Sequence, residues 1–315
     1  MQYRSLGKCG TKVSAFGLGG WTTYGGTVTD DKMVKSIIHA AFTAGINFFD
    51  IADVYARGAS EVAMGKVLKD LPRHELVISS KLFWPMSDDV NDSGLSRKHI
   101  MESIDKSLKR IGTDYLDIYF CHRFDANTPV EETVRAMDDL VHQGKILYWG
   151  TSEWTGAQIR QARGICDHRN LYAPQVEQPQ YNLMSRTKFE QDVAPVCLDA
   201  SMGTVVWSPL ASGFLTGKYD TAVPAGSRLA QMEWLKDSLY TEDKISRVRA
   251  FGERSQALGI TRTQLALAWA VSHPAVSSVI LGASKLEQLQ ENLGALTVKI
   301  SPEVRADLEK LFPLA

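Results

Sequence analysis

The chain of 315 residues has few cysteines and no long hydrophobic run. Its four cysteines, Cys9, Cys121, Cys166 and Cys197, form no C-x-x-C pair, so we expect incidental cysteines in a reducing compartment. No apolar stretch approaches the roughly 20 residues that a membrane-spanning helix needs. The N-terminus, MQYRSLGKCGTKVS, lacks the apolar core of a secretory signal. The sequence therefore predicts a soluble, cytoplasmic protein without a membrane span.

An excess of charge of one sign is also absent. The 35 basic residues are balanced by 36 acidic ones, and the basic residues are dispersed along the chain. Proteins that bind nucleic acid usually carry a basic patch or stripe, so nucleic acid is not the expected partner. The composition, 44% hydrophobic and 23% charged, is that of an ordinary globular protein, and a chain of this length can bury a large core.

Short runs rich in Val, Ile, Phe and Tyr alternate with longer amphipathic stretches. Such runs are typical of buried parallel strands. The stretch after Ser96 shows the helical pattern, with a capping serine, one apolar stripe and a stop at Gly112. The expected strands are Ala15–Leu18, Asn47–Asp50, Leu76–Ser79, Tyr115–Phe120, Leu147–Gly150, Gln175–Gln178, Thr204–Trp207 and Ser278–Leu281. The expected helices are Asp30–Ala44, Ser60–Leu71, Ser96–Ile111, Pro129–His142, Gly156–Arg169, Thr187–Ser201, Asp243–Leu258, Thr263–Ser272 and Leu286–Leu293.

Eight strands, each followed by a helix, predict an α/β fold, a (β/α)₈ TIM barrel that forms one domain over residues 1–315. Residues 1–12 are expected to form a hairpin that closes the bottom of the barrel. Residues 209–240 form a long connection after the seventh strand, and residues 302–311 a final surface helix. A doubly wound sheet is the alternative, but the glycines of GLGGWTTYGG do not fit its G-x-G-x-x-G turn.

Polar residues end the expected strands, where barrels of this kind carry their active sites. Asp50 and Tyr55 follow the second strand, Lys81 ends the third and His122 ends the fourth. Taken singly, each has an ordinary reading as a cap, a packed ring or a solvated charge. No second His or Cys lies at ligand spacing from His122 and Cys121, so no metal site is expected.

Taken together, Asp50, Tyr55, Lys81 and His122 suit the protonation of a carbonyl oxygen. The ordinary pKa of tyrosine is near 10, and a nearby ammonium lowers it, so Lys81 is expected to lower the pKa of Tyr55. Asp50 would hold Lys81, and Tyr55 would protonate a developing alkoxide. His122 would orient the carbonyl. Because this group supplies a proton and no hydride, the hydride must come from a cofactor.

The chain resembles the aldo-keto reductase superfamily, and within it the potassium-channel β-subunit-like group. The resemblance covers nearly the whole length. It implies NADPH-dependent reduction of aldehydes and ketones, and it carries the family's catalytic residues onto Asp50, Tyr55, Lys81 and His122. The segments that carry the resemblance are GLGGWTTYGG, FFDIADVYARGASEVAMGK, SSKLFW, DYLDIYFCHRFD, GKILYWGTSEW, VEQPQYN, WSPLASGFLTGKY and ILGASKLEQLQENLGA.

The resemblance also implies a set of contacts to NADPH (NADP⁺). Ser152 and Gln178 match the residues that hold the nicotinamide carboxamide, and Trp207 matches the aromatic that stacks on the ring. Glu153 stands where the family often has Asn or Arg. Ser284 and Arg228 match contacts to the 2′-phosphate, to which Lys285 could add charge. The expected cofactor-binding set is Gly20, Trp21, Asp50, Ser152, Gln178, Trp207, Ser208, Pro209, Leu210, Ser212, Lys218, Arg228, Gly282, Ser284, Gln288, Glu291 and Asn292.

Aromatic residues follow the first, third and fourth expected strands and predict an apolar mouth for a small-molecule carbonyl substrate. Arg123 either attracts an anionic substrate or binds backbone carbonyls, and the sequence leaves both readings open. The mouth is expected to contain Trp21, Tyr24, Phe83, Trp84 and Phe124, and the substrate pocket itself Trp21, Tyr24, Tyr55, Trp84 and His122.

Three functions stay open at this point. The first is an NADPH-dependent reductase. The second is an NADPH-binding regulatory or ion-channel auxiliary subunit with slow chemistry, and the third is a barrel hydrolase or lyase that uses no nicotinamide. The mammalian channel subunits that resemble this chain carry Asn at the position of His122. His122, together with the lack of a long N-terminal extension, therefore favours the enzyme, and a homo-oligomer is a further expectation.

Overall fold

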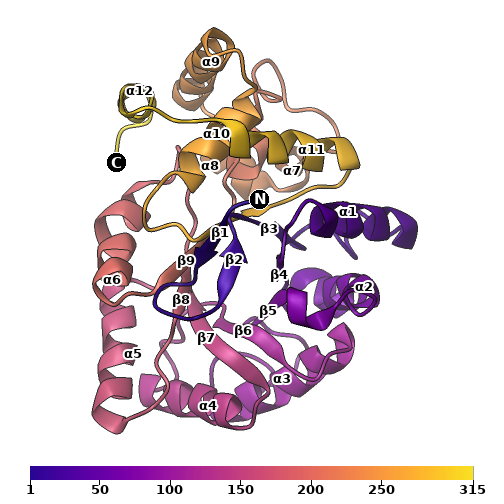
Figure 1. Ribbon diagram of the computed structural model, residues 1–315, viewed down its shortest axis with the longest axis vertical. Helices are drawn as coiled ribbons and strands as arrows, with labels where there is room; N and C mark the ends of the chain where they lie inside the picture. Colours follow the sequence, from indigo (N-terminus) through magenta and orange to yellow (C-terminus); the bar gives the residue numbers. More distant parts are fainter. Residues whose placement is uncertain (315) are drawn as a thin grey trace.

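A computed structural model describes residues 1–314 (Figure 1). Eight parallel strands close a barrel in the order β10-β3-β4-β5-β6-β7-β8-β9. The predicted (β/α)₈ barrel is thereby confirmed, and the doubly wound alternative is wrong. The strands are β3 (Phe16–Gly19), β4 (Phe48–Asp50), β5 (Val77–Leu82), β6 (Leu116–Cys121), β7 (Ile146–Ser152), β8 (Val176–Gln178), β9 (Gly203–Val206) and β10 (Ser278–Leu281).

Helices surround the barrel and begin and end at residues that the sequence marks (Figure 1). Ser96 accepts a hydrogen bond from the backbone of His99 at the start of α3, and Gly112 ends the same helix with φ 77°. Both residues have the conformations that helix ends require. The helices that follow barrel strands are α1 (Asp31–Thr43), α2 (Ala59–Leu68), α3 (Arg97–Ile111), α4 (Val130–His142), α5 (Gly156–Arg169), α6 (Ala194–Asp199), α10 (Arg262–Val271) and α11 (Leu286–Gly294).

Two stretches depart from the simple pattern. The helix expected over 187–201 is divided into a π-helical segment η3 (Lys188–Val193) and α6, because Pro195 has no N–H to continue the helical ladder. The connection 209–240 is partly helical and contains η4 (Ala211–Thr216), α7 (Arg228–Gln231) and α8 (Glu233–Leu239). Two further helices, α9 (Glu242–Ala257) and α12 (Pro302–Leu311), complete the C-terminal part.

An antiparallel hairpin of β1 (Tyr3–Ser5) and β2 (Lys12–Ser14) lies across one end of the barrel (Figure 1). Leu6 and Val13 of this hairpin are fully buried and belong to the apolar cluster that fills the barrel. The other buried members of this cluster are Phe48, Val77, Ile118, Phe120, Val176, Val205 and Ile280. The hairpin therefore closes this end of the barrel, as predicted.

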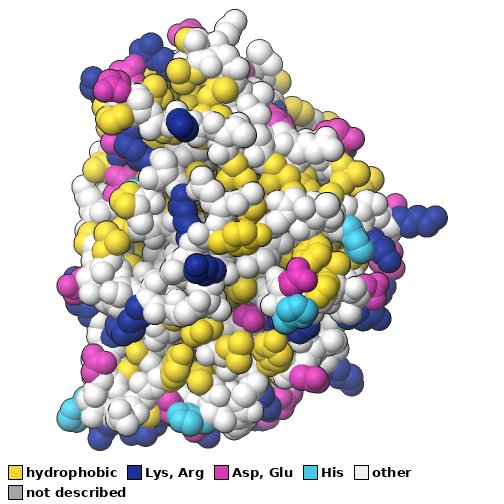
Figure 2. Space-filling view, viewed as in Figure 1, with side chains coloured by type: hydrophobic (Ala, Val, Ile, Leu, Met, Phe, Trp, Pro, Cys, Tyr) yellow, Lys and Arg dark blue, Asp and Glu magenta, His cyan; other side chains and the backbone are white. Residues whose placement is uncertain are grey.

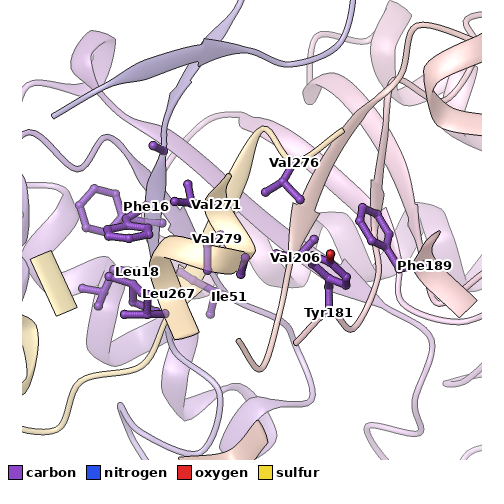
Figure 3. Close-up of a cluster of buried hydrophobic side chains, with 14 of the residues drawn as sticks. Phe16, Leu18, Ile51, Tyr181, Phe189, Val206, Leu267, Val271, Val276 and Val279 are labelled. Carbon is purple, nitrogen blue, oxygen red and sulfur yellow. The ribbon is translucent and has the colours of Figure 1, made fainter. Parts of the chain in front are cut away.

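A second and larger core lies between the barrel and its helices (Figure 3). Along β10 the side chains alternate, so that Ile280 points into the barrel while Val279 and Leu281 point outward. Val279 joins Phe16 and Leu18 of β3, which pack with Leu267 and Val271 of α10. The strand ends are thus held between two apolar layers, and their polar side chains are placed by rigid elements.

Acidic and basic side chains are interspersed over the face shown in Figure 2. Neither sign gathers into a broad patch on that face. Within residues 1–314, none of the helices combines the length and the apolar character needed to cross a membrane.

Candidate active site

A cavity of about 1090 Å³ opens at the carboxyl ends of the barrel strands, opposite the hairpin. Its lining includes Asp50 at the end of β4, Ser152 at the end of β7 and Gln178 at the end of β8. The sequence-predicted residues that line it are Trp21, Asp50, Tyr55, Trp84, His122, Ser152, Gln178, Trp207, Ser208, Pro209, Leu210, Ser212, Lys218, Arg228, Gly282, Ser284, Gln288, Glu291 and Asn292.

Lys81 lies just beneath this cavity and is fully buried. Its Nζ donates to Asp50 Oδ2 at 2.7 Å, to the backbone oxygen of Ile51 at 2.6 Å and to Tyr55 Oη at 3.1 Å. An ammonium has three N–H groups, and all three are used here. Burial lowers the pKa of Lys81, and the carboxylate of Asp50 opposes that effect. The arrangement of acceptors suits the charged form of Lys81.

Asp50 is held by three side-chain donors from two strands, β5 and β8. Its Oδ1 accepts from Ser79 Oγ at 2.7 Å and from Gln178 Nε2 at 2.9 Å, while Oδ2 accepts from Lys81. Ser79 is opposite Asp50 in the register of β4 and β5. The sequence reasoning missed Ser79, although it lies two residues before Lys81 and therefore on the same face of β5. The carboxylate is fixed before any ligand binds.

Tyr55 keeps its proton at neutral pH. Burial raises the pKa of Tyr55 well above its ordinary value, Asp50 acts in the same direction, and Arg123 opposes both. The lowering expected from Lys81 is therefore wrong for this structure, because burial raises the pKa of the phenol and Asp50 compensates the charge of Lys81 at 2.7 Å. Since Tyr55 Oη accepts from Lys81, its own O–H is available to donate into the cavity.

The backbone directly after Tyr55 is unusual. Ala56 and Arg57 have φ of 50° and 51°, and Gly58 has φ of 87° before α2 begins. Left-handed backbone costs a non-glycine residue roughly 1–2 kcal/mol. Strain of this kind is common where a side chain is held for function. Here it turns the chain so that Tyr55 lines the cavity while α2 packs against the barrel.

His122 is a neutral group beside Tyr55. The two ring centroids are 5.8 Å apart, and the rings are inclined at 75°. Burial lowers the pKa of His122 well below its ordinary value, and the charges of Lys81 and Arg123 lower it further. The buried Nδ1 has no hydrogen-bond partner in the described part of the chain. A neutral imidazole of this kind can donate one hydrogen bond to an oxygen in the cavity.

Trp207 forms the wall of the cavity above β9, and Glu153 holds it. Trp207 Nε1 donates to Glu153 Oε1 at 2.9 Å, and the indole meets Trp21 edge-on at 5.8 Å. Glu153 Oε1 also accepts from the backbone of Gln180, and Oε2 pairs with Lys188 Nζ at 2.8 Å. Glu153 itself does not line the cavity. Its role, which the sequence left open, is to hold the edge of the indole.

The connection after β9 meets the loop after β3 across the cavity. Arg228 donates to Thr22 Oγ1, and its guanidinium lies 5.2 Å from the ring centroid of Trp21. Thr22 has φ of 56°. On the neighbouring turn, the backbone N–H of Ser284 donates to Gln288 Oε1 at 2.8 Å. The structure thus brings the predicted phosphate-binding residues to one side of the cavity.

The remaining predicted residues lie outside the cavity lining. Tyr24 was expected in the substrate pocket, but it is buried, and its hydroxyl donates to the backbone oxygen of Ala283 at 3.0 Å. It therefore joins two loops. Phe83 and Phe124 are half-buried, and their rings lie edge-on to Trp84 at 5.1 Å and to Trp154 at 4.9 Å respectively.

Gly20 was expected to contact the cofactor, and it also lies outside the lining. A Cβ at Gly20 would come within 2.4 Å of Ser60 Oγ and 2.9 Å of Met64 Sδ. This glycine therefore allows the loop after β3 to approach α2.

Two buried carboxyl groups behind the site were not anticipated. Burial and the nearby Glu61 raise the pKa of Asp53 to about 8, and Asp53 Oδ2 has no partner within residues 1–314. Glu61 accepts from Ser80 Oγ at 2.6 Å and pairs with Arg110. Asp53 lies between Asp50 and Tyr55 in the segment DIADVY, which is the one sequence signal that could have revealed it.

Residues 1–314 contain no group of three or more His, Cys, Asp or Glu side chains placed to hold a metal ion. The fold and the site define a (β/α)₈-barrel protein with a hydrogen-bonded Tyr–Lys–Asp group at the carboxyl ends of its strands. The chain belongs to the aldo/keto reductase family, whose model matches residues 15–312. The family in general consists of oxidoreductases that reduce carbonyl compounds with NAD(P)H.

Similar proteins cover the chain almost completely. It is 46% identical over 319 residues to a "probable voltage-gated potassium channel subunit beta" of Arabidopsis thaliana, covering 99% of this chain and 97% of that protein. It is 46% identical over 316 residues to a protein of the same name from Oryza sativa subsp. japonica, covering 98% and 96%. A "putative voltage-gated potassium channel subunit beta" of Schizosaccharomyces pombe is 44% identical over 319 residues, covering 98% and 93%.

Proposed function

We propose that the protein reduces aldehydes and ketones to alcohols with NADPH as the hydride donor and Tyr55 as the general acid. The observation that carries this proposal is the bond from Lys81 Nζ to Tyr55 Oη at 3.1 Å, which leaves a protonated phenol directed at the cavity beside neutral His122. Membership of the aldo/keto reductase family supports the reaction class.

The residues that line the cavity fit a dinucleotide. The volume of the cavity, about 1090 Å³, slightly exceeds the usual range for small-molecule sites, roughly 300–1,000 Å³, as a large ligand requires. Ser152 and Gln178 would hold the carboxamide of the nicotinamide, and Trp207 would lie against its ring. When bound, the cofactor supplies the hydride. The rest of the dinucleotide would contact the predicted residues Trp21, Ser208, Pro209, Leu210, Ser212, Gly282, Gln288, Glu291 and Asn292.

Three basic residues on one side of the cavity suit the phosphates. Lys218, Arg228 and Lys285 line it, and none of them pairs with an acidic side chain in residues 1–314. We assign Arg228, with Ser284, to the 2′-phosphate, which accounts for NADPH as the preferred cofactor. Arg228→Ala should then weaken NADPH binding far more than NADH binding. Equal losses for the two cofactors would place the phosphate elsewhere.

The proton has a defined origin. Reduction adds a hydride to the carbonyl carbon and a proton to its oxygen, and Tyr55 Oη gives that proton. The tyrosinate that results keeps the hydrogen bond donated by Lys81 Nζ, which Asp50 holds at 2.7 Å. His122 donates a hydrogen bond to the same oxygen and orients the carbonyl. Tyr55 then recovers a proton from solvent before the next turnover.

The direct test follows the absorbance of NADPH and of NADH with a panel of aldehydes, ketones and α-dicarbonyls. We expect oxidation of NADPH with at least one class and a weaker response with NADH. Binding of NADPH, seen as quenching of tryptophan fluorescence, without oxidation by any carbonyl compound would refute the reductase. Neither binding nor oxidation would favour a barrel enzyme without nicotinamide.

The names of the relatives support a second candidate, an NADPH-binding auxiliary subunit of a potassium channel. His122 and the intact Tyr55–Lys81–Asp50 group favour the reductase over this candidate. The two are separated by turnover. An auxiliary subunit with vestigial chemistry would oxidise bound NADPH once, slowly, and release the product too slowly for sustained activity.

A further inference from the structure

Arg123 is a basic residue at the catalytic end of the cavity that the proposed reaction does not use. It follows His122 directly, is half-buried and lines the cavity together with Tyr55 and Trp84. One guanidinium nitrogen donates to the backbone oxygen of His122. The guanidinium carbon lies 5.7 Å from the ring centroid of Trp84, whose ring is braced by Phe83. Arg123 is therefore anchored, with further N–H groups left to bind a ligand.

The charge of Arg123 has no counter-charge among the described residues. It forms no ion pair with an acidic side chain within residues 1–314, unlike the half-buried Arg110 and the buried Arg186, which pair with Glu61 and Glu190. The acidic residues that line the cavity are Asp50 and Glu291. Asp50 is compensated by Lys81, and Glu291 belongs to α11. The catalytic end therefore keeps one uncompensated positive charge.

The strand order separates Arg123 from the other basic residues of the cavity. Lys218 and Arg228 follow β9, and Lys285 follows β10, whereas Arg123 follows β6. In the closed order β10-β3-β4-β5-β6-β7-β8-β9, β6 lies four positions from β10 in either direction. Arg123 is thus across the barrel mouth from the side assigned to the cofactor phosphates. Its charge is therefore in a position to bind a charged group on the substrate.

We propose that Arg123 binds a carboxylate on the substrate, so that the preferred substrates are aldehydes or ketones with an acid group remote from the carbonyl. A guanidinium binds a carboxylate through two parallel hydrogen bonds. Trp84 offers a flat apolar wall to the part of the substrate that lies between the acid group and the carbonyl. One guanidinium matches the single charge of a carboxylate, whereas a phosphate monoester carries nearly two. This inference rests on the proposed reductase function.

The test uses a matched pair, 4-carboxybenzaldehyde and its methyl ester. The ester activates the aldehyde more strongly than the carboxylate does, so a preference for the acid cannot come from intrinsic reactivity. We expect kcat/KM for the acid to exceed that for the ester by about tenfold, carried mainly by KM, which is the scale of one hydrogen bond to a charged group. The 2- and 3-carboxy isomers and 4-formylphenyl phosphate complete the series.

Variants test whether the preference for the acid over the ester depends on Arg123. Arg123→Gln should reduce the acid-to-ester ratio to about one, and Arg123→Lys should retain part of it because the charge remains. Arg160→Gln is the matched control, since Arg160 is exposed on α5 and lies outside the cavity lining. The ratio should be unchanged in Arg160→Gln. A ratio that falls equally in Arg160→Gln and Arg123→Gln would overturn the assignment, as would a phosphate ester better used than every acid.

A binding measurement separates this inference from the proposed function. Calorimetry with NADP⁺ compares 4-(hydroxymethyl)benzoate with its methyl ester on the native chain and on Arg123→Gln. Turnover of both aldehydes without an acid preference overturns the carboxylate site and leaves the reductase standing. Absence of turnover, with tighter binding of the acid that depends on Arg123, refutes the reductase and supports the site. If the acid is preferred over the ester neither in turnover nor in binding, the carboxylate site is refuted, whether or not the protein is a reductase.

Discussion

The two ends of the barrel are built from the same strands, but one end is closed and apolar and the other is open and polar. At the hairpin end, Leu6 and Val13 are buried in an apolar cluster and the barrel is closed. At the other end, Asp50, Lys81 and Gln178 lie at or next to the last residues of neighbouring or facing strands and share hydrogen bonds. The comparison teaches that stability and chemistry are separated along the strand direction, as is general for this architecture.

The largest effect is expected at the closed end. Leu6→Ala removes a fully buried side chain and should lower the free energy of unfolding by about 2–5 kcal/mol. Urea denaturation measures this loss. Activity per folded molecule should be unchanged below the unfolding transition. A large loss of turnover in the folded fraction would mean that the two ends are not independent.

The next effect is expected at the open end. Tyr55→Phe removes the proton donor and should reduce turnover by at least ~10²-fold, the usual scale for a general acid. The free energy of unfolding should change little, because the hydroxyl is not needed to fill the core. Steady-state kinetics and tryptophan quenching by NADPH separate catalysis from binding. Turnover within a few-fold of the native rate would remove Tyr55 from its role.

A pH-dependent effect is expected between the two ends, at Glu177 on β8. Burial raises the pKa of Glu177 from 4.5 to about 8, and its Oε1 has no partner in residues 1–314. The folded state thus holds a proton that the unfolded state has lost. This contribution to stability is complete below pH 4.5 and is lost as the pH rises through 8.

Glu177→Gln should therefore stabilise the protein, relative to the native chain, progressively more from pH 5 to pH 8, by on the order of 1–3 kcal/mol. Thermal unfolding at several pH values measures the difference. Asp53, whose pKa is also raised to about 8, is present in both proteins, so its contribution to the difference in stability cancels. A difference that does not vary with pH would show that Glu177 is ionised in the folded state.

The smallest effect is expected at Glu153, which holds Trp207. Glu153→Ala leaves Trp207 Nε1 without its acceptor and should weaken NADPH binding by about three- to tenfold, the scale of one hydrogen bond. Glu153→Gln keeps an acceptor oxygen and should recover most of the affinity. Equal affinity in the Ala and Gln variants, with an unchanged tryptophan emission spectrum, would contradict the positioning role.

The fold was predictable from local signals. Ser96 and Gly112 mark the ends of α3, and short apolar runs mark the strands. Pro195 is a further local signal, because it marks the break before α6. The single helix predicted over 187–201 did not take this proline into account. Signals of this kind depend on one segment at a time, and for that reason a single sequence carries them.

The details of the site depend on distances between segments, and these could not be predicted. The direction of the pKa shift of Tyr55 is decided by burial and by the 2.7 Å contact of Lys81 with Asp50. Tyr24 follows β3 as Trp21 does, yet the loop turns its ring away from the cavity. The role of Glu153 is visible only in the structure, where β7 and β9 place it beside Trp207.

The central claim is that the open end of the barrel transfers a hydride and a proton to a carbonyl group. The most direct measurement is a single-turnover experiment in which the protein, loaded with stoichiometric NADPH, is mixed with excess aldehyde. The account predicts oxidation of all bound NADPH with one alcohol formed per cofactor, and at least ~10²-fold slower oxidation in Tyr55→Phe. NADPH that stays bound and reduced with every aldehyde, or oxidation at the same rate in Tyr55→Phe, would contradict it.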